Sequence, residues 1–430
     1  MRDVLCVAVL ALGFAATAAA ELPRGDAAQL GFDPQGLASL DAAIEARIDA
    51  GAFPGAVIMV ARDGRIAHLS SLGARSEGGG PMPEDAIFRI YSMTKPVTSV
   101  VAMQLVEEGR LQLAAPVSRY LGDAWAALTV ATGRAADGSI ETEAARRQPT
   151  VQDLLRHTAG LSYGFFGSGP ARAAMDAANL ENGGFSNREV AAKLAQLPLE
   201  HHPGEVWEYS RATDVLGAVI EVVDGRSLGA AMQARIFDPL RMVDTGFWID
   251  DAAAHARLAE TRPEDRMIGS LEVFDPRRER AFESGGGGLV STIHDYARFA
   301  QMLLNGGELD GARILSPATV AYMKADHLGD IPGGRYYLPG PGYGFGLGFG
   351  VRRAAGVAPF IGSPGEFYWG GAAGTYVVWD PAEDLFILYM MASPANRLAM
   401  RPILRNMVYG ALTRSRLAAD RCTTQPTGDP

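Results

Sequence analysis

Patterns typical of β-strands occur near both ends of this chain, whereas the long stretch between them has helical spacing. Near the N-terminus, "PGAVIMVARDGRIAHLSSLG" contains two β-rich runs that flank an Asp-Gly turn, which predicts a hairpin. Near the C-terminus, "YGFGLGFGV", "TYVVWDP" and "LFILYMM" predict further strands. We therefore expect an α/β fold of the α+β type, in which both chain ends contribute to one antiparallel sheet flanked by helices.

The predicted domain runs from residue 21 to residue 415. Its sheet parts are expected at about 30–90 and 335–412, and a mostly helical part at about 91–334. Apolar residues make up 48% of the 430 residues, which is enough for a large core. A ligand site is expected between the sheet and the helical part, because such interfaces are favoured places for pockets. Residues 416–430 are expected to form a disordered tail.

The N-terminus resembles a secretory signal peptide. Arg2 precedes a short apolar run, and small residues end it before Glu21, although Asp3 weakens the positive start. A buried N-terminal helix is the alternative. We expect residues 1–20 to be removed after Ala20 and the protein to be periplasmic or secreted. The apolar run is too short to span a bilayer, so no stable membrane insertion is expected.

Charge and lysine usage narrow the possible functions. The net charge is −10 and no basic block occurs, so nucleic-acid binding has no electrostatic support. Only three of the 39 basic residues are lysines, namely Lys95, Lys193 and Lys324. Arginine stays protonated in proteins, whereas a desolvated lysine can lose its proton. Lys95 is therefore a candidate for proton transfer, while chance is the expected explanation for the other two lysines.

Ser92 and Lys95 stand three positions apart at the predicted start of a buried helix. At this spacing the two side chains share one helix face and can touch. Burial and the helix dipole both favour the neutral form of Lys95, which could then act as a base for the serine hydroxyl. Pro96 disfavours helical geometry at the lysine. The alternative is a chance match in which Ser92 only caps the helix.

Two other stretches could complete such a site. Tyr209 follows a Pro-Gly turn, and a nearby cation would lower its pKa and let it accept or relay a proton. Trp369, Gly370 and Gly371 precede a strand, where glycines allow close backbone approach to a substrate. The N–H of Ala372 could pair with that of Ser92 as an oxyanion hole. The alternatives are a half-buried strand tyrosine and a glycine β-bulge.

Together these stretches resemble the serine β-lactamase and penicillin-binding protein superfamily, in particular its class C β-lactamase-like branch and the family VIII carboxylesterases. The resemblance covers about residues 30 to 412. It rests on six blocks in the same order: "PGAVIMVARDGRI", "FRIYSMTKPVTSV", "TVQDLLRHTAGL", "PGEVWEYSRATDVLG", "GGGGLVSTIHDYARF" and "WGGAAGTYVVWDP".

The resemblance implies a role for each matching residue. Ser92 would be the acylated nucleophile, and Lys95 would activate it. Tyr209 would share the role of base. The N–H groups of Ala372 and Ser92 would hold the oxyanion. Neither a metal nor a cofactor is implied, and no obligate protein partner is expected.

Two departures from the β-lactamase pattern change the expected substrate. Residues 209–211 read Tyr-Ser-Arg where β-lactamases of this branch carry Tyr-x-Asn, and residues 369–371 read Trp-Gly-Gly where they carry Lys-Thr-Gly. Tryptophan offers an apolar face and cannot hold the carboxylate of a β-lactam. Arg211 could restore some positive charge near the substrate. The Trp-Gly-Gly variant resembles the esterase group.

We therefore expect a carboxylesterase of short-chain acyl esters that works through an acyl-serine intermediate. One alternative is a β-lactamase or a D-Ala-D-Ala carboxypeptidase. A second is an acyltransferase, which differs only in the acceptor. A third is a non-catalytic protein that binds cell-wall peptides, against which the intact Ser92, Lys95 and Tyr209 argue.

Several other motifs are expected to be structural. "GLSYG" matches the Gly-x-Ser-x-Gly nucleophile elbow around Ser162, but a helix-like stretch precedes it where that motif needs a strand. His157 beside it is expected to occupy a turn. His201 and His202 lack a further residue at ligand spacing, so a loop pair is expected in place of a metal site. The glycine run 285–288 is not followed by the Lys-Ser/Thr of a phosphate-binding loop.

One aromatic group leaves two interpretations open. It lies in a stretch rich in proline and glycine, where the side chains could line an acyl pocket or pack a loop. Its members are Tyr336, Tyr337, Tyr343 and Phe345.

Overall fold

The computed structural model describes residues 21–181, 184–269 and 271–417. The predicted signal peptide and the predicted tail beyond residue 417 lie outside these ranges. Within them, no helix is both long enough and apolar enough to cross a membrane.

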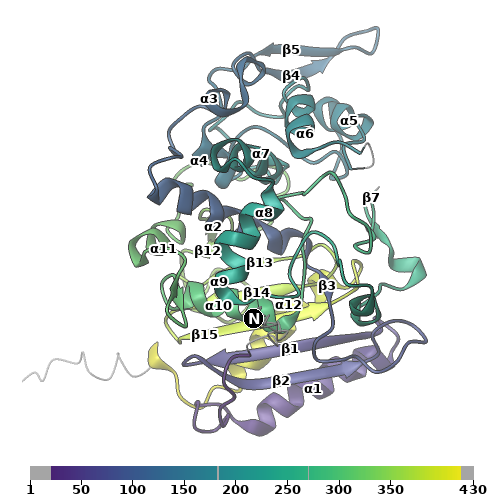
Figure 1. Ribbon diagram of the computed structural model, residues 1–430, viewed down its shortest axis with the longest axis vertical. Coiled ribbons are helices and arrows are strands. Elements are labelled where there is room, and N and C mark those ends of the chain that lie inside the picture. The colour runs from purple at the N-terminus through teal and green to yellow at the C-terminus, as the bar shows by residue number, and fades with distance from the viewer. Residues whose placement is uncertain (1–20, 182–183, 270, 418–430) are drawn as a thin grey trace, which may run out of the picture.

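A seven-stranded sheet forms one end of the molecule, and strands from the two ends of the chain lie side by side in it (Figure 1). Its order is β11-β12-β13-β14-β15-β1-β2, and all neighbours are antiparallel. The prediction of one antiparallel sheet from both ends is confirmed. The strands are β1 (Gly55–Arg62), β2 (Arg65–Gly73), β11 (Tyr343–Phe345), β12 (Gly350–Arg352), β13 (Phe367–Gly370), β14 (Tyr376–Asp380) and β15 (Leu385–Met391).

The first two strands form the predicted hairpin. Asp63 and Gly64 make the turn, both with positive φ, as the Asp-Gly signal requires. β1 then pairs with β15 in a register that joins Ala56 to Met391 and Arg62 to Leu385. All eight residues of β1 are buried, because strands flank both of its edges and helices cover both faces of the sheet.

Alternation along β1 divides the core into two layers. Ala56, Ile58 and Val60 point toward α1 (Pro34–Asp49) and α12 (Arg397–Gly410), which cover one face of the sheet. Alternate residues of β1 join the larger core on the other face, which α10 (Ile293–Leu304) covers directly. This period of two is the pattern expected for a strand with helices on both faces.

Helices dominate the middle of the chain, and α3 to α7 lie above the sheet in Figure 1, whereas α9 and α10 overlap it in this view. α2 is buried as predicted and contacts α7, and Gly109 with φ of 71° follows its end. The helices of this region are α2 (Thr94–Glu107), α3 (Ser118–Leu121), α4 (Val151–Leu155), α5 (Pro170–Ala177), α6 (Asn187–Leu194), α7 (Ala212–Asp224), α8 (Leu228–Met232), α9 (Asp238–Leu240), α10 and α11 (Pro317–Met323).

The middle region also contains short strand pairs that the helical prediction omitted. The largest is exposed, and Asp137 and Gly138 in its connection supply a hairpin signal. Tertiary pairing rather than local pattern creates the shorter ones. The pairs are β4 (Thr129–Arg134) with β5 (Ile140–Ala144), β3 (Phe88–Arg89) with β8 (Val290–Ser291), β6 (Met267–Ile268) with β7 (Leu271–Glu272), and β9 (Glu308–Leu309) with β10 (Ala312–Arg313).

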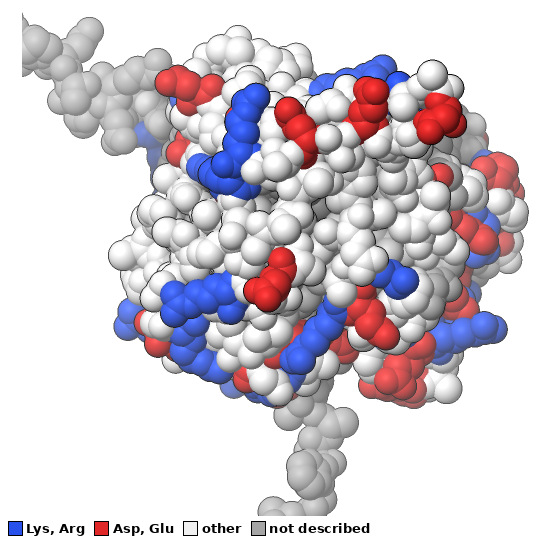
Figure 2. Space-filling model, turned by 90° about the horizontal axis from the view of Figure 1, so that it is seen from above, with Lys and Arg blue, Asp and Glu red and all other residues white. Residues whose placement is uncertain are grey.

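The surface of the helical end carries charges of both signs. Figure 2 shows acidic and basic side chains interspersed on this face, with uncharged surface between them. Such a face gives a polyanion no continuous basic track, in keeping with the negative net charge of the sequence.

Candidate active site

Ser92 lies in a short 3₁₀ turn, Tyr91–Met93, that leads into α2. Tyr91 has a φ of 42°, which is uncommon for a non-glycine residue, and its ring packs edge-on against Phe274 with centroids 5.3 Å apart. Strained backbone of this kind persists where the surroundings hold it in place, and it clusters at functional sites. Ser92 lines a cavity of about 700 Å³ between the sheet and the helical region, where a pocket was predicted.

Lys95 is fully buried one turn beyond the serine. Its Nζ lies 3.3 Å from Ser92 Oγ, 3.1 Å from Tyr163 Oη and 2.5 Å from the carbonyl oxygen of Gly286. Burial lowers the pKa of Lys95 to about 7, with Asp214 opposing that shift. A large fraction of Lys95 is therefore neutral near pH 7 and can accept a proton from the adjacent hydroxyl.

Tyr209 reaches the same serine from the segment before α7. Its hydroxyl donates a hydrogen bond of 2.6 Å to Ser92 Oγ, and Lys95 Nζ lies 4.6 Å from the centre of its ring. A neighbouring cation, Arg401, does lower the pKa of Tyr209, but the net shift is upward. Burial dominates and raises the pKa, and the hydrogen bond with Ser92 only partly offsets this. Tyr209 is thus a protonated phenol in the resting site.

The turn after β13 lies against the turn that holds Ser92. Gly371 N–H donates to the carbonyl of Thr375 at 2.7 Å, and Thr375 Oγ1 donates to the carbonyl of Ile90 at 3.2 Å. A Cβ on Gly371 would lie 2.5 Å from that Ile90 oxygen, so only glycine permits this approach. Ala372 lines the cavity, and within the described part of the chain its N–H has no hydrogen-bond partner. This N–H is available to a ligand oxygen.

Trp369 and Gly370 form the wall beside Tyr209. The Trp369 ring is buried, with its centroid 5.4 Å from that of Tyr209 and 5.3 Å from that of Phe345. Where a β-lactamase would present an ammonium group, this site presents an aromatic surface. A Cβ on Gly370 would collide with the guanidinium of Arg401, so glycine lets that arginine lie against β13.

Arg211 does not line the cavity, although the sequence made it a candidate for substrate contact. Its guanidinium pairs with Glu181 at 2.6 Å and with Asp214 at 3.5 Å, and it lies over the ring of Tyr163. The side chain is only 5% exposed. Its charge is therefore already neutralised behind the aromatic wall, and it cannot restore a cation for a bound substrate without breaking these pairs.

Two residues at the site escaped the sequence analysis. Tyr163, which contacts Lys95, lies in the "GLSYG" stretch that was considered only for its serine. Asp214 accepts hydrogen bonds from Ser284 Oγ at 2.6 Å and from Gly286 N–H at 2.9 Å. Asp214 thereby fixes the carbonyl of Gly286 that receives the Lys95 ammonium. The glycine run at 285–288 was the available signal, since close packing requires it.

The motifs around Ser162, His157, His201 and His202, which were expected to be structural, lie outside the reactive group. Ser162 is buried, does not line the cavity, and follows α4 rather than a strand. His157 occupies a turn with φ of 58°, and its Nδ1 lies 3.2 Å from Ser210 Oγ. His201 and His202 face different acids and do not converge, since the Nε2 atom of His202 lies 3.0 Å from Glu143.

The aromatic side chains between residues 336 and 345 could line a pocket or pack a loop, and most of them pack the loop. Tyr336 lines the cavity, whereas the Tyr337 hydroxyl donates to the carbonyl of Tyr343 at 2.7 Å. Phe345 is fully buried against Trp369.

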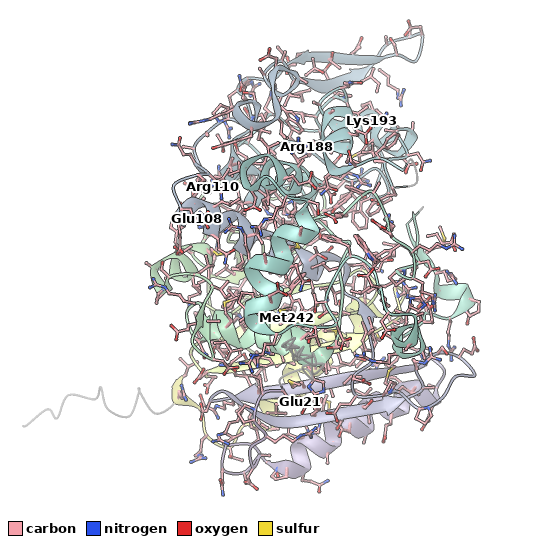
Figure 3. All side chains as sticks on the ribbon, in the orientation of Figure 1. Glu21, Glu108, Arg110, Arg188, Lys193 and Met242 are labelled. Atoms are coloured by element: carbon pink, nitrogen blue, oxygen red, sulfur yellow. The ribbon has the colours of Figure 1, made fainter. Side chains whose placement is uncertain are left out.

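One group of side chains has the composition of a metal site, but it lies elsewhere. Glu21, Glu84 and His294 bring their ligand atoms within 4.8 Å of one another, and Figure 3 shows Glu21 at the sheet end of the molecule. Arg24 already pairs with Glu84 at 2.7 Å and neutralises part of the charge a cation would need. None of these three described residues lines the cavity at Ser92.

Comparison with known proteins identifies the family. A family model described as Beta-lactamase matches residues 40–406. The chain belongs to the beta-lactamase family. Protein Rv1367c of Mycobacterium tuberculosis (strain ATCC 25618 / H37Rv) is 39% identical over 364 residues, which cover 81% of this chain and 88% of that protein.

Two further relatives of this beta-lactamase family member are described as hydrolases. Esterase EstB of Burkholderia gladioli is 33% identical over 401 residues, covering 86% of this chain and 95% of EstB. The solved structure of EstCE1, described as a hydrolase with promiscuous acyltransferase activity, superposes with a TM-score of 0.72. It is 28% identical and covers 87% of this chain and 99% of its own. The chain is thus a serine hydrolase of the beta-lactamase family.

Proposed function

We propose that this protein hydrolyses short-chain acyl esters by way of an acyl-serine intermediate at Ser92. The observation that carries the proposal is the position of Lys95, whose Nζ lies 3.3 Å from Ser92 Oγ and whose pKa burial lowers to about 7. A neutral amine at this distance is a competent base for the serine hydroxyl.

In acylation, Ser92 Oγ attacks the ester carbonyl while its proton passes to Lys95. The tetrahedral oxygen would bind the N–H groups of Ala372 and Ser92, an oxyanion hole at the end of β13. Lys95 and Tyr209 then deliver the proton to the leaving alcohol as the carbon–oxygen bond breaks. Tyr209 suits this role because it is protonated and its hydroxyl already lies 2.6 Å from Ser92 Oγ.

In deacylation, water attacks the acyl-enzyme and Ser92 leaves as the free hydroxyl. The family resemblance implied that Tyr209 shares the role of base, but its raised pKa makes the phenolate scarce near neutral pH. We assign the base role to neutral Lys95 in both half-reactions, with the Tyr209 hydroxyl orienting the reacting oxygen.

The walls of the cavity favour neutral acyl groups. Trp369, Tyr163 and Phe166 line it, and Arg211 is withdrawn into ion pairs. The relatives EstB and EstCE1, whose descriptions name an esterase and a hydrolase, support ester chemistry over β-lactam chemistry.

Acyl transfer is a second candidate, favoured by the description of EstCE1 as a hydrolase with promiscuous acyltransferase activity. The same acyl-enzyme would be released by an alcohol in place of water. Adding a small alcohol to the ester assay and measuring the new ester against free acid distinguishes the two outcomes. We further propose that the protein acts after export, on the strength of the N-terminal sequence alone.

The decisive experiment compares hydrolysis of p-nitrophenyl butyrate and nitrocefin by the mature protein and by Ser92→Ala. We expect ester turnover in the wild type, little nitrocefin cleavage, and loss of ester turnover by about four orders of magnitude or more in the variant. Ser162→Ala is the matched control and should retain turnover. Efficient nitrocefin cleavage would instead favour a β-lactamase, and ester turnover that survives in Ser92→Ala would refute the mechanism.

A further inference from the structure

A second cavity, of about 500 Å³, lies behind the loop that carries the glycine run 285–288. Gly288 lines the cavity at Ser92, whereas Glu283 lines the second cavity. Phe247, which also lines the second cavity, abuts the glycine run, because a Cβ on Gly288 would lie 2.8 Å from its ring. No described residue lines both cavities, so the loop separates them.

All charged side chains that line the second cavity in the described part of the chain are acidic, and they are Asp244, Asp250, Asp251 and Glu283. Arg257 neutralises Asp244 through an ion pair of 2.6 Å. Among the described residues, only neutral N–H and O–H donors contact the other three carboxylates. Such donors satisfy the oxygen atoms but leave the negative charge in place. The second cavity therefore carries acidic groups without basic partners.

Glu283 is the most deeply buried of these acids, with 8% of its surface exposed. Its oxygens accept hydrogen bonds from Gly229 N–H at 2.7 Å and from Ser227 Oγ at 3.3 Å. A Cβ on Gly229 would lie 2.7 Å from Glu283 Oε1 and 3.3 Å from the Phe247 ring, so glycine lets the carboxylate and the ring lie beside one another. Burial and the charge of Glu283 raise the pKa of Glu221. A buried carboxylate without a cation, beside an aromatic ring, favours a positively charged ligand.

The helix that begins beside Glu283 does not require a charged acceptor. Ser227 is the N-cap of α8, and its side chain accepts a hydrogen bond from Ala230 N–H at 3.2 Å. Glu221 accepts one from Leu228 N–H at 3.2 Å. Because these side chains satisfy two N–H groups of the first turn, a neutral acceptor at position 283 would suffice for the third. The charge of Glu283 is therefore available to a ligand.

The rest of the lining is largely apolar and includes three aromatic side chains. Phe237 and Phe247 are buried, and Trp248 is half-buried. The faces of aromatic rings attract cations, and the indole face does so most strongly. Such walls offer a metal ion no ligand atoms, but they match the carbon skeleton of an organic cation.

We infer that this second cavity binds a small organic ammonium ion. Its charge meets the Glu283 carboxylate, and its apolar part packs against Phe237, Phe247 and Trp248. An arylalkylammonium ion combines both features, and a hydrogen bond between charged groups is stronger than one to a neutral donor. Binding at this site goes beyond the proposed esterase function and does not require Ser92 to react.

The test is isothermal titration calorimetry of the purified protein with 2-phenylethylammonium chloride and with 2-phenylethanol, which has the same skeleton without the charge. We expect the ammonium ion to bind in a saturable manner and the alcohol to bind at least about tenfold more weakly. Glu283→Gln keeps an acceptor for the N–H of Gly229 but removes the charge, so the affinity for the ammonium ion should fall by about tenfold or more. Trp248→Leu should lower that affinity about threefold, because an aromatic face is lost.

Two further variants locate the bound ion. Glu279→Gln removes an exposed carboxylate from the cavity at Ser92 and should leave the affinity unchanged. Ser92→Ala should bind the ammonium ion as the wild type does, because the nucleophile lies outside the second cavity. The titration can therefore be read whether or not the protein is an esterase.

Several outcomes would overturn the site. Failure of the ammonium ion to bind, or equal affinities for the ammonium ion and the alcohol, would do so. A loss of affinity in Glu279→Gln that exceeds the loss in Glu283→Gln would place the ion in the cavity at Ser92 instead. If Glu283→Gln does not fold, Trp248→Leu decides, and an unchanged affinity in that variant would overturn the site. Each of these outcomes leaves the esterase proposal standing.

Discussion

The inner end of the cavity at Ser92 is buried and closely packed, whereas its outer rim is exposed to solvent. At the inner end, Lys95 and Tyr209 are buried, and the polar atoms of both lie within hydrogen-bond distance of Ser92 Oγ. Lys95 also reaches the carbonyl oxygen of Gly286. At the outer rim, to which residues 272–280 and 397–401 contribute, Arg278 and Glu279 are exposed and Leu398 is 59% exposed.

We therefore expect the inner end to carry out the reaction and the outer rim to determine which substrates are preferred. Close packing holds a buried base and its serine at a fixed distance, which catalysis requires. Side chains at an exposed rim can change without disturbing that geometry. Substitutions at the inner end should therefore abolish or shift the reaction, while those at the rim should alter preference.

After Ser92→Ala, the largest effect is expected from Lys95→Arg. Arginine keeps the positive charge but cannot lose a proton, so kcat/KM for p-nitrophenyl butyrate should fall by about a thousandfold. Lys193→Arg is the matched control: Figure 3 shows Lys193 on α6 in the helical region, and its Nζ lies over the ring of Phe185. Retention of activity in Lys95→Arg would mean that this position acts through charge alone.

The next effect concerns pH. Neutral Lys95 is the active form and its pKa is about 7, so kcat/KM should fall as the pH drops below that value. The carboxylate of Asp214 raises the pKa of Lys95, so Asp214→Asn should move the acid limb of the profile to lower pH. It should also destabilise the protein by about 1–3 kcal/mol through the lost hydrogen bonds. If the maximum of kcat/KM falls but the pH at which it declines does not move, Asp214 acts only on the stability of the fold.

A glycine pair tests how tightly the inner end is packed. A Cβ on Gly286 would lie 2.9 Å from Asp214 Oδ1, whereas one on Gly287 would have no neighbour closer than 3.7 Å. Gly286→Ala should lower the free energy of unfolding by about 1–3 kcal/mol, and Gly287→Ala should change it by less than about 0.5 kcal/mol. Thermal unfolding of the two variants measures the difference. Equal melting temperatures would show that the glycine run is not closely packed.

The smallest effect is expected at the rim. Leu398→Ser should change the free energy of unfolding by less than about 0.5 kcal/mol, because the side chain is largely exposed. It should raise KM about threefold for p-nitrophenyl decanoate relative to the butyrate, as one apolar contact is lost. Val357→Ser, at an equally exposed position outside this cavity, is the control. A large loss of turnover on both esters would contradict the division between the two ends.

The sequence predicted the sheet because strand alternation and the Asp-Gly turn are local signals. The pair Ser92 and Lys95 was equally readable, since three positions on a helix fix their distance. The contact of Tyr163 with Lys95 and the ion pair of Arg211 with Glu181 could not be predicted, because both join segments that lie far apart in the chain. The direction of the Tyr209 pKa shift also required the tertiary structure, since burial there outweighs any nearby charge.

The pairing of β1 with β15 also determines when the protein can finish folding. β1 is buried on both faces in the folded protein, yet it is synthesised more than 300 residues before its partner strand β15. Until then, an apolar strand edge stays open to other chains, a known route to aggregation. The active site likewise cannot form before β13, which carries Trp369 and Gly370, has been made.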